Sequence, residues 1–206
     1  MDISVIIPCH NLENYITPLC VSLNMQNLYQ FSAELVFVLD NCTDNTQQKI
    51  RRFPWDLNKF KINLLQGSFG SCGAARNHGL AYAEGDIIWF VDGDDWLTDA
   101  NAIAQIVNAF KQTEYKAIKF LWSAPSDYPT LYQRNMMVWQ YAYRREAIGD
   151  IKFPNTQPDE DFIFNKAVFA QEGMNLGLLS LPFYYYNFMR EGSNMYQFYT
   201  EGKVGS

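Results

Sequence analysis

Short apolar runs alternate with longer segments of helical period through the first part of this chain, and that alternation limits the fold more than any other feature. The apolar runs, rich in Val, Ile and Phe, are residues 3–8, 34–40, 61–66, 86–92 and 116–122. Helices are predicted between them at about 13–26, 44–53, 73–84 and 99–113. Strands and helices that alternate in this way build a mostly parallel, buried sheet with helices on its faces. The pattern therefore predicts an α/β fold.

The alternation stops after about residue 123, and the second part of the chain is built differently. Residues 123–135 are rich in Pro, Ser and Tyr and predict a loop. A short aromatic segment follows at 136–148, then a predicted helix at about 159–172 and an aromatic strand at 181–188.

The size and composition of the chain indicate one well-buried core. It has 206 residues, of which 48% are apolar, and a chain of this length can bury a single substantial core. We therefore expect one domain over 1–206, with a first half of about 1–122 and a smaller mixed half of about 123–206.

The charge of the chain argues against a nucleic-acid partner. There are 16 Lys and Arg against 22 Asp and Glu, for a net charge of −6. Affinity for nucleic acid comes mostly from Lys and Arg that neutralise phosphates. An anionic substrate stays compatible with this composition if a metal ion or a few local donors carry its charge.

Cysteine spacing and hydropathy indicate the compartment. The four cysteines, Cys9, Cys20, Cys42 and Cys72, form no C-x-x-C pair, which favours reduced thiols over a zinc site or a disulfide framework. The chain opens on a strand pattern and not on a secretion signal. No segment approaches the ~18 apolar residues needed to cross a bilayer. We therefore expect a cytoplasmic protein.

Polar residues gather at the carboxyl ends of three predicted strands. The first strand runs into Pro8, Cys9, His10 and Asn11, the second into Asp40, and the fourth into Asp92, Gly93, Asp94 and Asp95. In open parallel sheets, ligands bind beyond these strand ends. The three segments therefore predict one crevice lined by polar side chains.

The acids after the fourth strand have two readings. One residue separates Asp92 from Asp94, so on extended backbone both side chains point to the same side, and Gly93 allows a bulky group to approach the backbone. Mg²⁺ and Mn²⁺ prefer carboxylate oxygens, and Mg²⁺ is usually held by one or two carboxylates together with substrate phosphates. Alternatively, Asp-Gly forms an ordinary turn, and Asp95 or Asp99 caps the next helix.

The segment GSFGSCGAARNHG at 67–79 is rich in glycine and precedes a helix. It resembles a phosphate cradle, but it matches neither the P-loop nor the G-x-G-x-x-G pattern, and it has no Lys. Arg76, in the first turn of the helix, is suited either to a substrate phosphate or to a pairing with one of the aspartates.

A second acidic group, PDEDF at 158–162, opens the predicted helix of the second half. Acids in a first turn are favoured by the helix dipole. Alternatively, a carboxylate whose pKa is raised by neighbouring acids can act as a general base. The two histidines form no catalytic pair: His10 lies on the crevice side, whereas His78 is expected to be structural. No Ser-His-Asp arrangement is visible.

Taken together, these motifs resemble the family 2 glycosyltransferases, the inverting enzymes with the GT-A fold. The resemblance runs from residue 3 to about 195. ISVIIPCHNLENYI resembles the opening strand and turn of the family, and ELVFVLDNCTDNT its second strand. The most specific match is GAARNHGLAYAEGDIIWFVDGDDWL, which leads into the metal-binding D-x-D. VWQYAYRRE, DEDF and FYYYNFMREGS then follow in the order of the family.

The resemblance implies a Rossmann-like sheet whose first half binds a nucleotide sugar and whose second half faces the acceptor. It implies that Asp40 bonds the nucleobase and that Asp161 is the general base, with Glu160 beside it. It further implies that Asp94, together with Asp92, holds Mn²⁺ or Mg²⁺. The other positions implied to contact the nucleotide sugar are Pro8, His10, Asn11, Arg76, Gly93 and Arg190. This chain departs from the family pattern at Leu39, where an acid is common, and at His10, where an aromatic residue is usual.

The activity implied is transfer of a sugar, with inversion, from a nucleotide-diphosphate sugar. A UDP-sugar is the expected donor, and the hydroxyl of a glycan or lipid-linked acceptor in cell-surface polysaccharide synthesis is the expected acceptor. Association with the inner face of a membrane and a homodimer are both left open. Two alternatives remain at this point: a metal-dependent nucleotidyltransferase and a non-catalytic module that binds sugar nucleotides or glycans.

Overall fold

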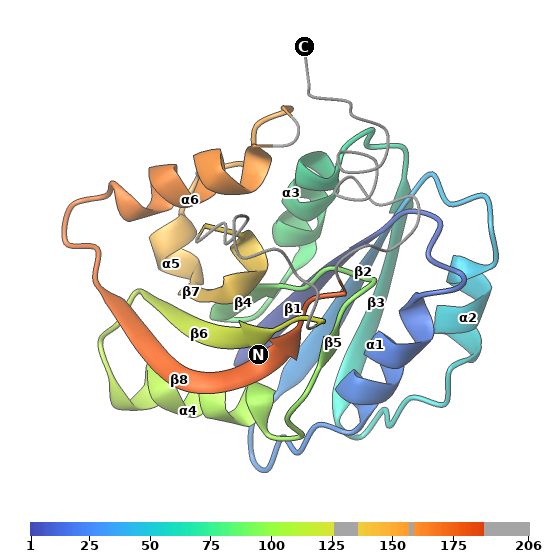
Figure 1. Cartoon of the computed structure of the whole chain (residues 1–206), viewed down its shortest axis with the longest axis horizontal. Helices are drawn as coiled ribbons and strands as arrows, with labels where there is room; N and C mark the ends of the chain where they lie inside the picture. The colour runs from blue at the N-terminus through green and yellow to red at the C-terminus, as the bar shows by residue number, and fades with distance from the viewer. Residues whose placement is uncertain (126–135, 157–158, 188–206) are drawn as a thin grey trace.

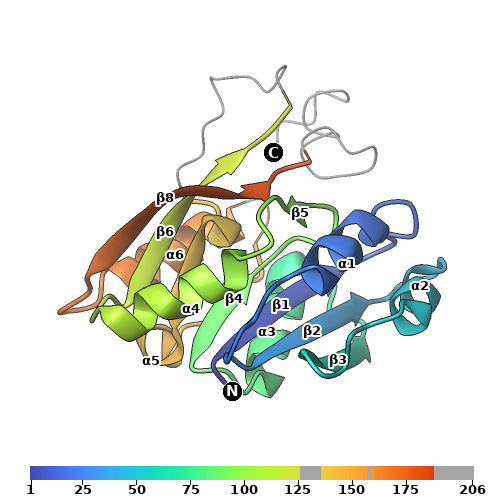
Figure 2. The same ribbon diagram turned by 90° about the horizontal axis from the view of Figure 1, so that it is seen from below.

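The computed structural model describes residues 1–125, 136–156 and 159–187, and these form one sheet with helices on both faces (Figures 1 and 2). The strands are β1 (Ile3–Cys9), β2 (Ala33–Asp40), β3 (Phe60–Gly67), β4 (Ile87–Phe90), β5 (Trp96–Leu97), β6 (Ala117–Ser123), β7 (Tyr141–Arg144) and β8 (Leu176–Tyr185). The helices are α1 (Ile16–Asn24), α2 (Thr46–Arg52), α3 (Cys72–Tyr82), α4 (Ala102–Gln112), the short 3₁₀ turn η2 (Val138–Gln140), α5 (Arg145–Ile148) and α6 (Glu160–Phe169). The strand order is β3-β2-β1-β4-β7-β6-β8-β5, which confirms the predicted α/β fold.

The four strands β3, β2, β1 and β4 are parallel neighbours, so their carboxyl ends meet at one edge. Every residue of β1 and β2 is buried, because helices cover both faces of a parallel sheet. Alternate residues of β1 enter different cores. Ile3, Val5 and Ile7 pack in the core that contains residues of α1, α2 and α4, whereas Ile6 packs in the core that contains residues of α3.

The second half of the sheet is mixed, as expected. β7 is antiparallel to both β4 and β6, and β8 is parallel to β6. Phe164 and Val168 of α6 and Ile148 of α5 share a core with Ala75 and Leu80 of α3. In Figure 1 these three helices accordingly lie together on one side of the sheet. The acidic start of α6 is thereby brought close to α3.

Two predicted boundaries were wrong in an informative way. β4 ends at Phe90 and not at residue 92, because residues 92–95 form a turn closed by a bond from Asp95 N to Asp92 O (3.2 Å). β8 begins at Leu176, earlier than the predicted 181. Within the described residues, no helix has both the length and the apolar character to cross a membrane.

Candidate active site

The turns after β1 and β2 are bound to each other. Asn11 and Asn41 each follow a strand with a positive φ, 50° and 47°, a conformation that Asn tolerates better than most residues. Asn11 Oδ1 accepts a bond from Thr43 N (2.9 Å), and Asp44 Oδ2 accepts one from Glu13 N (2.8 Å). The two loops therefore form a single wall beyond the strand ends.

The residues at and after the end of β1 that were implied to contact the nucleotide sugar divide between this wall and the core. His10 is exposed, and its Nδ1 donates to the carbonyl oxygen of Asp40 (2.7 Å). Because a carbonyl only accepts, the ring carries a proton on Nδ1, and Nε2 is left to accept the 3.4 Å bond from Asn11 Nδ2. Pro8, which was implied to contact the nucleotide sugar, is a buried residue of β1, within the predicted strand of residues 3–8.

Asp40 fixes the glycine-rich segment over the end of β2. Its Oδ1 accepts bonds from Phe69 N (2.6 Å) and Gly70 N (3.3 Å), and the residue is only 9% exposed. Gly70 has a φ of 77°, which glycine adopts without strain. The segment then enters α3, where the Ser71 side chain accepts from Ala74 N (3.1 Å). Asp40 therefore sets where α3 begins.

Gly93 lies in a tight space within the protein. A β-carbon at this position would overlap Leu12 Cδ1 and lie 3.1 Å from the carbonyl oxygen of Pro8. The sequence argument explained Gly93 by the approach of a ligand. In the structure the close neighbour is the end of β1, against which the turn after β4 packs.

The turn of residues 92–95 is held from β8. Tyr184 donates its hydroxyl proton to Asp95 Oδ2 (2.5 Å) and accepts a bond from Asp92 N (3.1 Å). Asn187 donates from its backbone to Asp95 Oδ1 (2.7 Å) and from its side chain to the carbonyl of Asp94 (3.1 Å). Burial, and then the charges of Asp94 and Asp92, raise the pKa of Asp95 well above its ordinary value. Asp95 therefore belongs to the turn, and its alternative role as a helix cap is wrong.

Helix α4 is capped elsewhere. Its N-cap residue is Asn101, and Asp99 Oδ1 accepts the backbone proton of Asn101 (2.7 Å). Of the two acids considered as caps, only Asp99 thus lies at the start of the helix.

Arg76 joins the acids of the two halves. It is 2% exposed, and its two terminal nitrogens bond Asp92 Oδ1 and Asp161 Oδ1, both at 2.7 Å. Glu160 Oε1 lies 3.7 Å away. Burial disfavours the charged form of Arg76, but the attraction of Asp161 and Asp92 outweighs it and raises the pKa. Of the two roles left open by the sequence, the structure shows the pairing with aspartates.

Asp161 and Glu160 are both buried, but their surroundings differ. Asp161 is 6% exposed, and its second oxygen accepts a bond from Val138 N (3.0 Å). Glu160 is 7% exposed, and its Oε2 has no hydrogen-bond partner in the described parts of the chain. Burial, followed by the charge of Asp161, raises the pKa of Glu160. One acid is thus fixed by Arg76, and the other keeps an oxygen able to accept a proton.

The acids of the turn suit a hard cation that brings its own further ligands. Asp92 is committed to Arg76, whereas Asp94 is partly exposed at the same edge. Among residues 1–125, 136–156 and 159–187, no three His, Cys, Asp or Glu side chains cluster tightly enough to hold a metal alone. One or two carboxylates with substrate phosphates and water are what Mg²⁺ ordinarily uses. The donor set therefore fits such an ion only together with a phosphate ligand.

Two further predictions fall elsewhere. Arg190 lies outside the described residues. His78 sits between the rings of Phe69 and Tyr82, with centroid distances of 4.5 and 4.9 Å, in agreement with a structural role.

Two tryptophans stack on tyrosines of β8. Trp139 lies flat on Tyr184 at 4.6 Å, and Trp96 on Tyr185 at 4.2 Å. Sequence reasoning missed Tyr184 and Asn187 as neighbours of the acidic turn. The only signal for them was the aromatic strand itself, which read as core.

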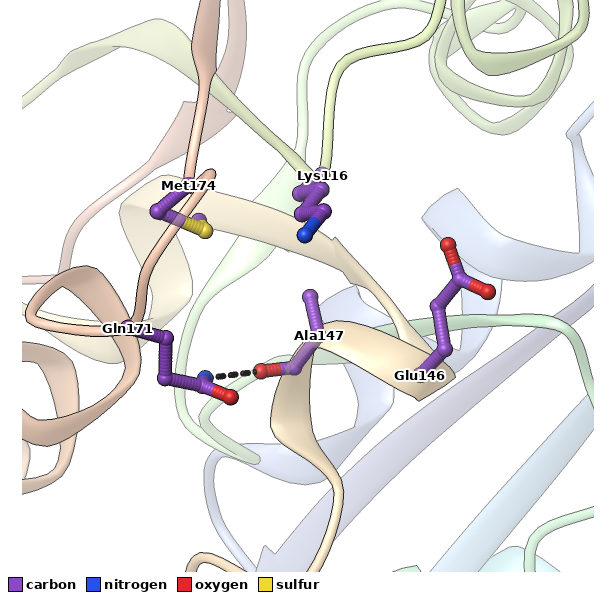
Figure 3. Close-up of a pocket in the computed structure, with 5 residues that line it drawn as sticks. All are labelled: Lys116, Glu146, Ala147, Gln171 and Met174. Atoms are coloured by element: carbon purple, nitrogen blue, oxygen red, sulfur yellow. Dashed lines mark hydrogen bonds between the residues drawn. The ribbon is translucent and has the colours of Figure 1, made fainter.

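A hollow of about 300 Å³ lies away from these acids (Figure 3). Its lining comprises Lys116, Glu146, Ala147, Gln171 and Met174, and Gln171 donates to the carbonyl of Ala147 (2.5 Å). Lys116 immediately precedes β6. Because β6 and β4 are both antiparallel to β7, the start of β6 is at the opposite edge of the sheet from the acidic turn. The candidate active site is therefore the group of acids around Arg76 and the turn of residues 92–95.

Several known proteins are similar to this chain in sequence. The family model described as glycosyl transferase family 2 matches residues 4–169. Poly(ribitol-phosphate) beta-N-acetylglucosaminyltransferase TarS of Staphylococcus aureus is 40% identical over 97 residues, which are 47% of this chain and 17% of that protein. An uncharacterized glycosyltransferase of Haemophilus influenzae is 29% identical over 79% of this chain and 69% of its own length.

Solved structures agree in fold. The structure of S. aureus TarS 1-349 in complex with UDP-GlcNAc has a TM-score of 0.80 at 27% identity, covering 95% of this chain and 61% of that one. A mannosyltransferase from Pyrobaculum calidifontis has a TM-score of 0.74 at 18% identity, covering 92% and 58%. The sequence match thus covers 17% of TarS, and the structural match covers 61% of the TarS 1-349 structure.

Proposed function

Because this chain belongs to glycosyl transferase family 2, we propose that it is an inverting glycosyltransferase that uses a nucleotide-diphosphate sugar. The observation that carries this proposal is the buried Arg76, which holds Asp92 of the nucleotide side and Asp161 of the acceptor side at 2.7 Å each. In a direct displacement the acceptor hydroxyl attacks the anomeric carbon of the bound donor while a base takes its proton. Donor site and base must therefore lie close together, and Arg76 brings the two sets of acids to one place.

On this proposal, the first half binds the donor and the second half the acceptor. The wall built from His10 and Asn11, together with Asp40, takes the nucleotide. Asp94, with Asp92 beside it, would hold Mn²⁺ or Mg²⁺ against the donor diphosphate. Such an ion would offset the charge that develops on the leaving diphosphate.

The base belongs to the acidic start of α6. We assign Asp161 to take the proton of the acceptor hydroxyl, with Glu160 beside it. Both oxygens of Asp161 already accept bonds, from Arg76 and from Val138 N, so the acceptor hydroxyl would share one of these oxygens. Attack from the face opposite the leaving group would invert the configuration of the sugar.

Donor and acceptor classes are proposed from the relatives. The similar structure with UDP-GlcNAc favours a UDP-sugar donor. The names of TarS and of the minor teichoic acid biosynthesis protein GgaB of Bacillus subtilis favour an acceptor among cell-wall polysaccharides. We place the reaction in the cytoplasm, where UDP-sugars would reach the crevice, with the inner membrane face as the source of a lipid-linked acceptor.

The test is product analysis with UDP-sugars, Mn²⁺ and a poly(ribitol phosphate) or lipid-linked glycan acceptor. Release of UDP with a glycosylated acceptor is expected, whereas release of pyrophosphate would identify a nucleotidyltransferase instead. Binding of UDP-sugars without turnover would identify a binding module. Asp161→Asn should keep UDP binding and lose transfer, and Asp94→Ala should lose the effect of Mn²⁺. Unchanged transfer in both variants would refute the assignment of roles.

A further inference from the structure

Tyr184 of β8 and Asn187, two residues beyond the strand, make four hydrogen bonds to the acidic turn. Tyr184 contacts the backbone of Asp92 and the carboxylate of Asp95, and Asn187 contacts Asp95 and the carbonyl of Asp94. The bonds therefore reach three residues of the turn, and one of these is Asp94, the proposed ligand of the cation. Tyr184 and Asn187 both belong to the second half of the chain, whereas the turn belongs to the first.

Tyr184 is itself held rigidly. It is fully buried, its ring lies parallel to Trp139 within 5°, and the carbonyl of Trp139 accepts a bond from Trp89 Nε1 (3.1 Å). Trp89 is a residue of β4, the strand that leads into the turn. The hydroxyl of Tyr184 is therefore fixed relative to the strand whose end it holds.

A buried acid at position 95 is unfavourable in a turn whose only role is to be stable. It is 1% exposed and lies beside two other acids, and a buried carboxylate near like charges is unfavourable unless its bonds compensate. Both of its oxygens do accept bonds, from Tyr184 and from Asn187. Because both oxygens are bonded to residues of the second half, the arrangement fixes the geometry of the turn.

We propose that Tyr184, Asp95 and Asn187 are positioning residues that hold Asp94 where a divalent cation on a nucleoside diphosphate can reach it. This inference rests on the proposed function and adds residues of the acceptor-side half to donor binding. A cation with near-octahedral demands tolerates little error in its ligands. Loosening the turn should therefore weaken cation-dependent donor binding before it affects binding of the nucleotide alone.

The experiment is calorimetry of UDP binding in Mn²⁺ and in EDTA, with wild type, Tyr184→Phe and Asn187→Ala. Tyr184→Phe keeps the ring on Trp139 and removes only the hydroxyl. Loss of the two hydrogen bonds that this hydroxyl makes to the turn should weaken UDP binding in Mn²⁺ by about threefold to tenfold, with little change in EDTA. Asn187→Ala should act in the same direction and serves if Tyr184→Phe fails to fold.

A matched control is Tyr143→Phe. Tyr143 is equally buried, and its hydroxyl donates to Asn165 Oδ1 (2.5 Å) on α6, away from the turn. It should lose similar stability without loss of Mn²⁺-dependent UDP binding. Equal Mn²⁺ dependence in wild type, Tyr184→Phe and Asn187→Ala, including none in any of them, would overturn the inference. Failure of the proposed function would differ, because wild type would then bind no UDP under either condition.

Discussion

Removing the charge of Arg76 should destabilise the protein strongly at neutral pH and much less in acid. In Arg76→Met, the carboxylates of Asp161 and Glu160 would stay buried, at 6% and 7% exposure, without their cation. Removing one partner of a buried ion pair typically costs about 3–5 kcal/mol. In a domain of this size each kcal/mol shifts the melting temperature by about 2–4 °C, so a fall of roughly 6–20 °C is expected at pH 7.5.

The pH dependence follows from the sign of the shift. Without Arg76, the pKa values of the buried acids in the folded variant should lie above their unfolded values. The folded variant then binds more protons than the unfolded chain, so its stability rises as the pH falls through that window. Wild type lacks this gain at Asp161, because Arg76 stabilises the charged form. The difference between the two proteins should therefore shrink at pH 5.

Urea unfolding followed by tryptophan fluorescence at pH 7.5 and 5 measures both effects. Arg76→Lys keeps the charge but not the two planar nitrogens that span Asp92 and Asp161, so it should fall between wild type and Arg76→Met. Arg144→Met is the control, because within the described part of the chain Arg144 bonds backbone carbonyls and forms no ion pair with an acid. A loss below about 1 kcal/mol at pH 7.5, or one independent of pH, would show that Arg76 is not the cation that stabilises these acids.

Three further substitutions test other parts of the site and its support. Glu160→Gln should raise the melting temperature above pH 7 and lose that gain below about pH 4, because the raised pKa of Glu160 means that only its ionised form destabilises the fold. A difference in melting temperature from wild type that does not change with pH would contradict this. Gly93→Ala should cost about 1–3 kcal/mol in urea unfolding because the new methyl group overlaps Leu12, and a neutral result would mean that the turn can move. Glu34→Gln should cost about 1–3 kcal/mol, because Glu34 is fully buried and its Oε2 accepts from Asn63 (2.7 Å); unchanged unfolding would refute this.

The parallel half of the sheet could be predicted because burial there leaves a clear trace in the sequence. β1 and β2 are covered on both faces, so they read as continuous apolar runs, and their ends were placed within a residue. β8 has no such trace. Leu176, Leu178 and Leu181 are more than 40% exposed, so apolar residues in this segment do not mark a buried face. Gly177, Ser180 and Pro182 also interrupt the apolar run, and the start of the strand is not visible in the sequence. The four-residue β7 is shorter than any reliable periodic signal.

The strand-end position of the acids could be predicted, and so could a pairing of Arg76 with an aspartate, but not which aspartates it would join. Strand ends give the place of Asp40 and Asp92, because parallel strands present their carboxyl ends at one edge. Arg76 and Asp161 are 85 positions apart in sequence, and their pairing depends on how α6 packs on α3. That packing is decided by side chains such as Phe164 in the shared core, which no local pattern reveals.

The connections around Arg76 imply that the acids of the site do not act independently. Asp40 fixes the glycine-rich segment through Phe69 and Gly70 and so sets the start of α3. Arg76 lies in the first turns of α3 and carries that position on to Asp92 and Asp161. A change at Asp40 should therefore disturb the acceptor-side acid as well as the nucleotide. Substitutions at Asp40 and Asp161 should be non-additive, because residues joined through one network share their loss.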